Sequence, residues 1–376
     1  MHAHGLSSIV RLFLRTVIGM VMLGLLPIAA HAASVPSCQQ QASDDCYFSF
    51  QPAPGSGQLH YYASQSAEAA AAAGPTGPRS ALIVIHGHPR DANITFNAAL
   101  AASSLADTRK NTVIIAPVFQ VSPDEASKCS TAGVPTAQTG DLLWTCASWL
   151  DGGEADNARD ITSFTALDAL VVEVTRRWPT VRVVTIAGFS AGAQMVQHYI
   201  GFAAADVSSM IAIRYVVADP GTWLYFDGVR PIAEGDTTNE STCADASCRF
   251  HLAPPTNTCP NVNQWKYGTD GLPASLKRTA SVARAHYVSA DIFYLEAAQD
   301  SGTGRGTYSH ILDKSCAAEA QGSFRLQRGL AYAAYDRQLL APNKHRAVVV
   351  IPDCAHDVTC VFTSPTARAA LLSPSH

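Results

Sequence analysis

Short apolar runs alternate with segments of helical periodicity along most of the chain. The runs are rich in β-branched residues and too short for helices, which is typical of strands buried on both faces of a parallel sheet. They occupy residues 81–85, 112–119, 183–187, 210–217, 291–296 and 346–351. Helical periodicity falls between them, at 93–104, at 163–178, after residue 190 and at 317–340. This order predicts an α/β fold, a doubly wound, mostly parallel sheet with right-handed crossovers.

The pattern is weaker outside this core. Residues 58–64 alternate polar and apolar side chains and predict an edge strand. Residues 221–285 have poor periodicity and are rich in Gly, Pro, Asn and Thr, so we expect an insertion that caps the sheet. Trp223, Tyr225 and Trp265 within it are candidates for substrate binding, and ordinary packing inside the cap is the alternative for each of them.

The first 32 residues differ in composition from the rest. Two arginines flank an apolar core at 17–26, and the sequence Ala-His-Ala at 30–32 matches a signal-peptidase cleavage pattern. The apolar core is too short for a membrane span. We therefore predict a signal peptide at 1–32 and a mature domain at 33–376 that is secreted or periplasmic, with a retained N-terminal anchor as the alternative.

The charge balance disfavours some classes of partner. The 376-residue chain has 26 Lys and Arg against 30 Asp and Glu, a net charge of −4. This mild acidity favours neither nucleic acid nor an anionic membrane surface as a partner, so we expect neither after the signal peptide is removed. The sequence does not predict an oligomeric state.

All ten cysteines follow the predicted signal peptide. An even number of cysteines in an exported chain predicts disulfide bonds, although sequence alone does not determine the pairing. Proximity along the chain favours the pairs 38–46, 129–146, 243–248 and 354–360, which leaves 259 for 316. A zinc site is the alternative, but no C-x-x-C pair recurs at the spacing of a tetrahedral site, so we expect no metal.

Residues 188–192 read Gly-Phe-Ser-Ala-Gly, the G-x-S-x-G pattern of a nucleophile elbow. Such an elbow is a sharp turn from strand into helix that raises the hydroxyl of Ser190 above the sheet. Gly188 and Gly192 fit because the turn leaves no room for a β-carbon. A serine that only caps the helix is the alternative. The strand before the turn and the helix after it favour the elbow, and they place the Ala191 N–H at the positive end of the helix.

The strand at 81–85 ends in His86-Gly87-His88-Pro89, a second candidate site. A strand that runs into His-Gly is typical of the first half of an oxyanion hole. Because proline has no N–H, Pro89 cannot donate, and we expect the backbone N–H groups of His88 and Ala191 to form the hole. The Gly87 N–H is the alternative to that of His88. The alternative is that His86 and His88 bind a metal, but no carboxylate at a matching spacing joins them.

A serine nucleophile needs a histidine base, and the base needs a carboxylate to orient it. In chains with a nucleophile elbow, the order is serine, acid, histidine, each after a strand. Ser190, Asp300 and His356 satisfy this order, and His356 directly follows the last predicted strand. Other acids near in sequence are less well placed than Asp300; they are Glu296, Asp313, Asp353 and Asp357.

These motifs resemble those of the α/β-hydrolase superfamily, from about residue 58 to the C-terminus. The chain is also similar to secreted bacterial-type esterases and depolymerases that combine a disulfide-stapled sheet with a cap. It lacks the HGGG run of hormone-sensitive-lipase-like esterases, because His88-Pro89 replaces those glycines. The acyl pocket of those enzymes therefore cannot be carried over to this chain.

The resemblance implies a serine hydrolase that cleaves small or polymeric carboxylic esters without a cofactor. Ser190 attacks the carbonyl, His356 transfers the proton, Asp300 orients His356, and the N–H groups of His88 and Ala191 hold the oxyanion. One alternative is cleavage of a β-diketone by the same triad, as in hydrolases of oxidised polyvinyl alcohol. The other is a binding protein that keeps the fold without catalysis. The sequence predicts neither the acyl group nor the alcohol.

Overall fold

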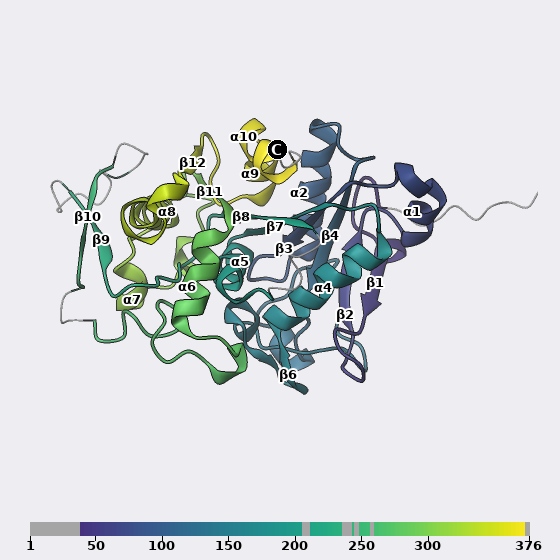
Figure 1. Ribbon diagram of the computed structural model, residues 1–376, viewed down its shortest axis with the longest axis horizontal. Coiled ribbons are helices and arrows are strands. Elements are labelled where there is room, and N and C mark those ends of the chain that lie inside the picture. Colours follow the sequence, from purple (N-terminus) through teal and green to yellow (C-terminus); the bar gives the residue numbers. More distant parts are fainter. Residues whose placement is uncertain (1–37, 205–210, 235–242, 244–247, 256–258, 373–376) are drawn as a thin grey trace, which may run out of the picture. The chain divides into compact units, whose positions relative to one another are not determined.

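A computed structural model describes residues 38–204, 211–234, 243, 248–255 and 259–372. The predicted signal peptide at 1–32 lies outside these residues. The described chain is built around an eight-stranded sheet in the order β1-β2-β4-β3-β7-β8-β11-β12 (Figure 1). Its strands are β1 (Tyr47–Phe50), β2 (Leu59–Ala63), β3 (Ser80–Ile85), β4 (Thr112–Val118), β7 (Val183–Phe189), β8 (Ala212–Ala218), β11 (Asp291–Ala297) and β12 (Val348–Ile351).

All neighbouring strands from β4 to β12 are parallel, and β1 and β2 are antiparallel to their neighbours. The prediction of a mostly parallel, doubly wound sheet is therefore confirmed. Residues 58–64 do contain a strand, β2, but the expectation that it lies at the edge of the sheet is wrong, because β1 lies outside it. Residues 47–50 pair outside β2, and the ring of Tyr47 stacks on His60 across the two strands at a centroid distance of 4.9 Å.

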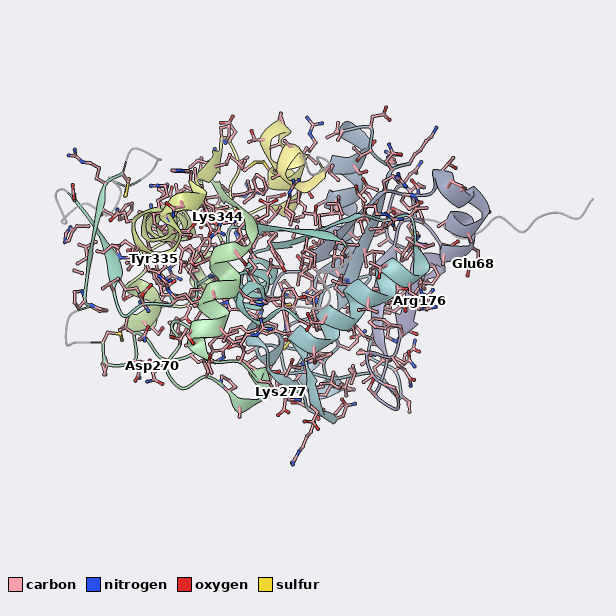
Figure 2. All side chains as sticks on the ribbon, in the orientation of Figure 1. Glu68, Arg176, Asp270, Lys277, Tyr335 and Lys344 are labelled. Carbon is pink, nitrogen blue, oxygen red and sulfur yellow. A yellow bond between two sulfur atoms is a disulfide. The ribbon has the colours of Figure 1, made fainter. Side chains whose placement is uncertain are left out.

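Helices cover both faces of the sheet because the strands alternate their buried side chains between two hydrophobic clusters. In β3, Ala81, Ile83 and Ile85 belong to one cluster, and Leu82 and Val84 to the other. One face carries α4 (Ser163–Arg177), α5 (Ala191–Phe202), α6 (Ala280–Ser289) and α8 (Arg325–Tyr335), and the other carries α2 (Ala92–Leu105), α9 (Val358–Thr363) and α10 (Pro365–Leu372) (Figure 1). Side chains fill the space between these layers, and Tyr335 of α8 is among the fully buried ones (Figure 2).

The segment between β8 and β11 contains an antiparallel pair of strands, β9 (Arg230–Ala233) and β10 (Phe250–Ala253), which lies outside the main sheet. The predicted insertion at 221–285 includes this pair and the start of α6. The remaining short α-helices and strands are α1 (Ala67–Ala73), α3 (Pro123–Ala126), β5 (Glu154–Ala155), β6 (Ala158–Thr162) and α7 (Cys316–Glu319). In the described ranges, no helix combines the length and the apolar character that a bilayer span requires.

All five disulfide pairs expected from proximity along the chain are present. Cys354–Cys360 joins the loop after β12 to α9, and Cys129–Cys146 closes part of the long segment between β4 and α4. Cys259–Cys316 links the insertion to α7, although the two residues are 57 positions apart. Disulfides of this kind stabilise a fold mainly by restricting the unfolded chain.

Candidate active site

Ser190 stands at the turn between β7 and α5, as the elbow pattern predicts. Its φ of 58° and ψ of −122° lie in a region that L-residues seldom adopt. A Cβ at Gly188 would overlap the backbone of Gly192, and a Cβ at Gly192 would overlap the carbonyl of Ile85 on β3. The tightness of the turn itself therefore requires Gly188, and its close approach to β3 requires Gly192. Ser190 makes no side-chain capping bond to α5, which removes the helix-cap alternative.

Ser190, His356 and Asp300 form a continuous chain of hydrogen bonds. Ser190 Oγ lies 2.8 Å from His356 Nε2, and His356 Nδ1 lies 2.7 Å from Asp300 Oδ2. Because an ionised carboxylate can only accept, the Nδ1 atom carries the proton and Nε2 is free to accept the serine hydroxyl. The three residues follow the carboxyl ends of β7, β11 and β12. In the sheet, β11 and β12 are neighbours, and β8 separates β7 from β11.

A buried arginine holds Asp300 in place. Arg325, at the start of α8, approaches Asp300 Oδ1 at 3.3 Å and donates to the carbonyl of Thr307 at 2.8 Å. The side chains of Asp300 and Arg325 are both nearly inaccessible to solvent. Because each charge compensates the other in a dry environment, the arginine fixes the carboxylate that orients His356.

The loop that carries His356 is tied down at several points. The His356 N–H donates to the carbonyl of Gly306 at 3.1 Å, and the Gln299 N–H donates to the carbonyl of Cys354 at 2.8 Å. The Cys354–Cys360 disulfide closes the loop around His356. Burial lowers the pKa of His356, and the charge of Arg325 lowers it further against the opposing effect of Asp300. His356 is therefore a neutral base at neutral pH.

Two backbone N–H groups, close to Ser190 in the chain or at its pocket, have no hydrogen-bond acceptor in the described part of the chain. Among the described residues, neither the His88 N–H nor the Ala191 N–H, the first of α5, has a hydrogen-bond acceptor. The Gly87 N–H donates to Asp91 Oδ1 at 2.7 Å, so Gly87 is not available for this role. The N–H groups of His88 and Ala191, the pair expected from the sequence, are therefore both free within the described ranges, and their role stays a prediction.

The neighbouring His86 is structural. Its Nδ1 lies 2.9 Å from the Gly87 carbonyl, and its Nε2 accepts from the Phe119 N–H at 3.2 Å. Burial lowers the pKa of His86 to about 3, so the ring is neutral. Both ring nitrogens are occupied, which leaves neither for a metal ion. In the described part of the chain, no group of three His, Cys, Asp or Glu side chains is arranged to hold a metal.

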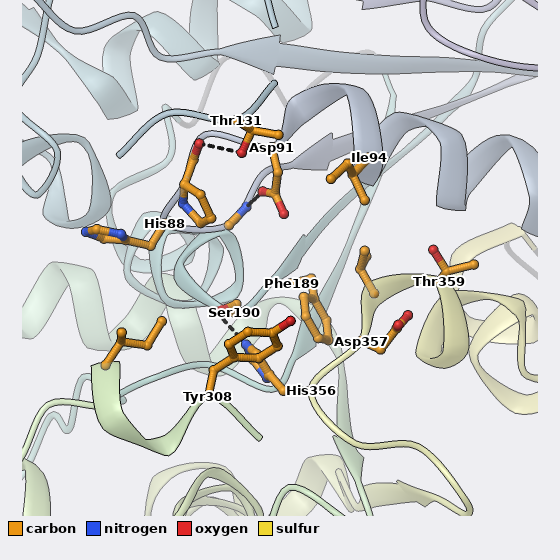
Figure 3. Close-up of a pocket in the computed structure, with 14 residues that line it drawn as sticks. His88, Asp91, Ile94, Thr131, Phe189, Ser190, Tyr308, His356, Asp357 and Thr359 are labelled. Atoms are coloured by element: carbon orange, nitrogen blue, oxygen red, sulfur yellow. Dashed lines mark hydrogen bonds between the residues drawn. The ribbon is translucent and has the colours of Figure 1, made fainter. Parts of the chain in front are cut away.

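An open pocket of about 370 Å³ lies above Ser190 (Figure 3). Three of its lining side chains are large, apolar and exposed: Tyr308 at 53%, Ile311 at 54% and Ile94 at 43%. We call these three residues the apolar rim. Ile94 extends from α2, and Tyr308 lies beside His356 across the pocket (Figure 3). The described lining contains two acids, Asp91 and Asp357, and neither lysine nor arginine.

The three aromatic residues expected to bind substrate are not at this pocket. Trp223 and Tyr225 are fully buried and pack against α8, where the ring of Trp223 stacks on Tyr332 at 4.3 Å. Trp265 packs edge-on against Phe202 at 5.5 Å. None of the described residues of 221–285 lines the pocket. The packing alternative therefore describes all three aromatics, because they pack against α5 and α8 and not at the pocket of Ser190.

The apolar rim was not predicted from the sequence. Tyr308 and Ile311 lie in a segment between β11 and β12 without periodicity, and Ile94 lies in α2, where most apolar residues face the core and Leu105 is also exposed. The only available signal was the position of 308–311 shortly after Asp300, in the segment that leads from the acid to the base. Exposure, which distinguishes these three side chains, is a property of the folded chain.

The comparisons with known proteins agree with this architecture. No protein-family model and no curated protein matches the chain. Poly(aspartic acid) hydrolase-1 from Sphingomonas sp. KT-1 superposes with a TM-score of 0.54 at 19% identity, over 89% of this chain and 100% of that one. LpqC, a poly(3-hydroxybutyrate) depolymerase from Bordetella parapertussis, superposes with a TM-score of 0.52 at 17% identity, over 86% of this chain and 93% of that one. From its strand order and these structural neighbours, the chain has the α/β-hydrolase fold.

Proposed function

We propose that this protein is a serine hydrolase that cleaves carboxylic esters through an acyl-enzyme intermediate. The observation that carries the proposal is the hydrogen-bonded chain from Ser190 through His356 to Asp300, beside two free N–H donors. A binding protein that only retained the fold would have no need for a serine held at an unfavourable φ with its Oγ on a neutral histidine.

The geometry supports the following steps. Ser190 Oγ attacks the ester carbonyl carbon while His356 Nε2 takes the hydroxyl proton, and Asp300 stabilises the resulting imidazolium. The negative charge that develops on the carbonyl oxygen is held by the N–H groups of His88 and Ala191. Collapse breaks the bond to the alcohol, which leaves with the proton from His356. A water molecule then attacks the acyl-enzyme by the same route and regenerates Ser190.

The pocket favours an uncharged ester with an apolar chain. Its rim is apolar, and the carboxylates of Asp91 and Asp357 in the lining would repel an anionic substrate. The two structural neighbours are named for different substrates: poly(aspartic acid), which is anionic, and poly(3-hydroxybutyrate), an uncharged polyester. The described pocket lining, with an apolar rim and no lysine or arginine, suits an uncharged polyester better than an anionic polymer. We therefore propose an uncharged ester, free or part of a polymer.

We also propose that the protein acts outside the cytoplasm. Ten cysteines joined in five disulfides are typical of chains that fold in an oxidising compartment. The signal-peptide pattern at 1–32 supports the same location.

The test compares wild type with Ser190→Ala on p-nitrophenyl butyrate. We expect kcat/KM to fall by at least about a thousandfold while the circular dichroism spectrum is unchanged. Ser309→Ala is the matched control, because Ser309 lies close in sequence to Tyr308 and its side chain has no partner among the described residues. The control should retain full activity, and an active Ser190→Ala variant would refute the proposal.

A fluorophosphonate probe gives an independent result, since it labels only an activated serine. Labelling of wild type and not of Ser190→Ala supports an enzyme, and no labelling of folded wild type supports a binding protein. A β-diketone assayed beside the ester separates the remaining alternative. Cleavage of the diketone with no turnover of any ester would contradict the proposal of an esterase.

A further inference from the structure

Two buried carboxyl groups lie next to Asp300 and take no part in the steps above. Asp219 directly follows β8, and Glu296 is the sixth residue of β11. Both residues are completely inaccessible to solvent. Acidic residues are almost never fully buried unless they are paired, so each of them requires a physical explanation.

Asp219 is connected to the turn that carries Asp300 by hydrogen bonds through the backbone of Ala297. Its Oδ1 accepts from the Ala297 N–H at 2.7 Å, and its N–H donates to the Leu295 carbonyl at 3.0 Å. The carbonyl of Ala297 in turn accepts from the Asp300 N–H at 3.1 Å. Asp219 therefore holds the end of β11 at the point where the chain turns to present the Asp300 carboxylate to His356.

Apart from Asp219 Oδ1, the carboxyl oxygens of Asp219 and Glu296 have no hydrogen-bond donor in the described chain if both side chains are ionised. Asp219 Oδ2, Glu296 Oε1 and Glu296 Oε2 are buried without a hydrogen-bond partner among the described residues. The two side chains lie within hydrogen-bonding reach of each other, but an ionised carboxylate can only accept. One proton between them turns this contact into a hydrogen bond and gives Asp219 Oδ2 its partner.

The charges around the pair also require that proton. The groups that face it include Asp300 and Arg325. Arg325 Nη1 is bonded to Asp300, and Arg325 Nε, which has no partner among the described residues, donates to neither acid. Burial raises the pKa of Asp219, and the charge of Asp300 raises it further. Burial raises the pKa of Glu296 well above its ordinary value, and Asp219 adds to this effect. Glu296 is thus the member of the pair that stays neutral.

Helix α8 is shaped to receive the Glu296 carboxyl. Gly329 lies inside this helix, where glycine is unfavourable compared with alanine. A Cβ at Gly329 would overlap the carboxyl group of Glu296. The glycine therefore provides the space in which Glu296 lies, which is an observation independent of the charges.

We propose that Glu296 is a neutral carboxylic acid whose O–H donates a hydrogen bond to Asp219, and that Asp219 is a positioning residue for Asp300. Asp219 acts through the backbone of Ala297 and does not touch His356 or the substrate. The protonation state of Glu296 is independent of the proposed function. The effect of Asp219 on turnover rests on the proposed function.

The first experiment is infrared difference spectroscopy of wild type against Glu296→Gln. The measurement is made in mildly alkaline buffer, where Asp151 and Asp336, whose pKa burial raises to about 6, are ionised. We expect the carbonyl stretch of a protonated carboxyl in wild type and its loss in the variant, whose amide keeps a donor for Asp219. Absence of the band in wild type, or its survival in the variant, would overturn the proposal.

The second experiment compares Asp219→Ala with Asp219→Asn. Rates are expressed per active site titrated with a fluorophosphonate, so that misfolded molecules are not counted. The alanine variant loses the acceptor for the Ala297 N–H, so we expect kcat to fall by about ten- to a hundredfold with KM unchanged. The asparagine oxygen retains that bond, so kcat should stay within about threefold of wild type.

Two kinetic outcomes would overturn the role of Asp219. One is an alanine variant with full kcat per site, and the other is an asparagine variant as impaired as alanine. Failure of the esterase proposal is distinguishable, because Ser190→Ala would then retain turnover while the infrared result for Glu296 would still hold. If Asp219→Ala does not fold, Asp219→Asn and the infrared comparison still test the two parts of the proposal.

Discussion

The Cys354–Cys360 disulfide offers a sharp test of how the site is held together. The bridge closes a loop around His356, and its two cysteines are six positions apart, with Cα atoms at 5.7 Å. Replacing both cysteines with serine removes the cross-link and leaves the two backbone hydrogen bonds of the loop in place. We expect the fold to survive and the position of His356 to become less well defined.

The size of the stability effect follows from the loop that each disulfide closes. For a closed loop of seven residues, the chain-entropy model gives about 2.4 kcal/mol of stabilisation at 25 °C. Cys38–Cys46, eight positions apart, closes a loop of similar length and gives about 2.6 kcal/mol. This second bridge lies near the first strand and does not line the pocket. It is therefore a control matched in stability and separated from catalysis.

The assay measures urea unfolding and ester turnover for both double variants. We expect both to lose about the same free energy of unfolding, near 2 kcal/mol. Only Cys354→Ser/Cys360→Ser should lose kcat, by about tenfold, because His356 must meet Ser190 and Asp300 at once. Equal kcat in the two double variants would refute the reasoning, since it would mean that the backbone hydrogen bonds alone fix His356.

Three further predictions concern charge and specificity. Because burial, with a smaller contribution from Arg325, lowers the pKa of His356 below the ordinary value of a histidine, the midpoint of the acidic decline in kcat/KM should lie below pH 6.5 in a pH series. Arg325→Met should destabilise the fold by about 3–5 kcal/mol and move this acidic limb to higher pH, measured by chemical unfolding and a pH series. Ile94→Ser should lower kcat/KM for a p-nitrophenyl octanoate about fivefold and leave the acetate unchanged. Leu105→Ser, which alters another exposed residue of α2 outside the pocket, should change neither, and an equal loss in both variants would contradict a role for the rim.

Much of the fold could be predicted from the sequence because its strands are buried on both faces. Runs such as 81–85 and 113–119 are apolar throughout, a pattern typical of strands buried on both faces. The first strand was missed because residues 47–50 are only half-buried and show no clean alternation. An edge strand of this kind is defined by its partner, here β2, more than by its own residues.

The site could be predicted where chemistry restricts the residues at fixed places along the chain. Ser190, Asp300 and His356 follow strand ends, and the hydrogen bonds in the structure join all three. The substrate contacts could not be predicted in this way. Tryptophan occurs both in binding sites and in protein cores, so the residue type of Trp223 does not distinguish the two roles. Its packing against Tyr332 of α8 in the folded chain identifies it as a core residue.

The apolar rim has a consequence for engineering. Ile94, Tyr308 and Ile311 are about half exposed, so their replacement disturbs little packing and should be tolerated by the fold. Phe189 and Val358, which line the same pocket, are buried and lack this freedom. A saturation library restricted to the three rim positions would therefore search for new chain preferences while the groups that make and break bonds stay untouched.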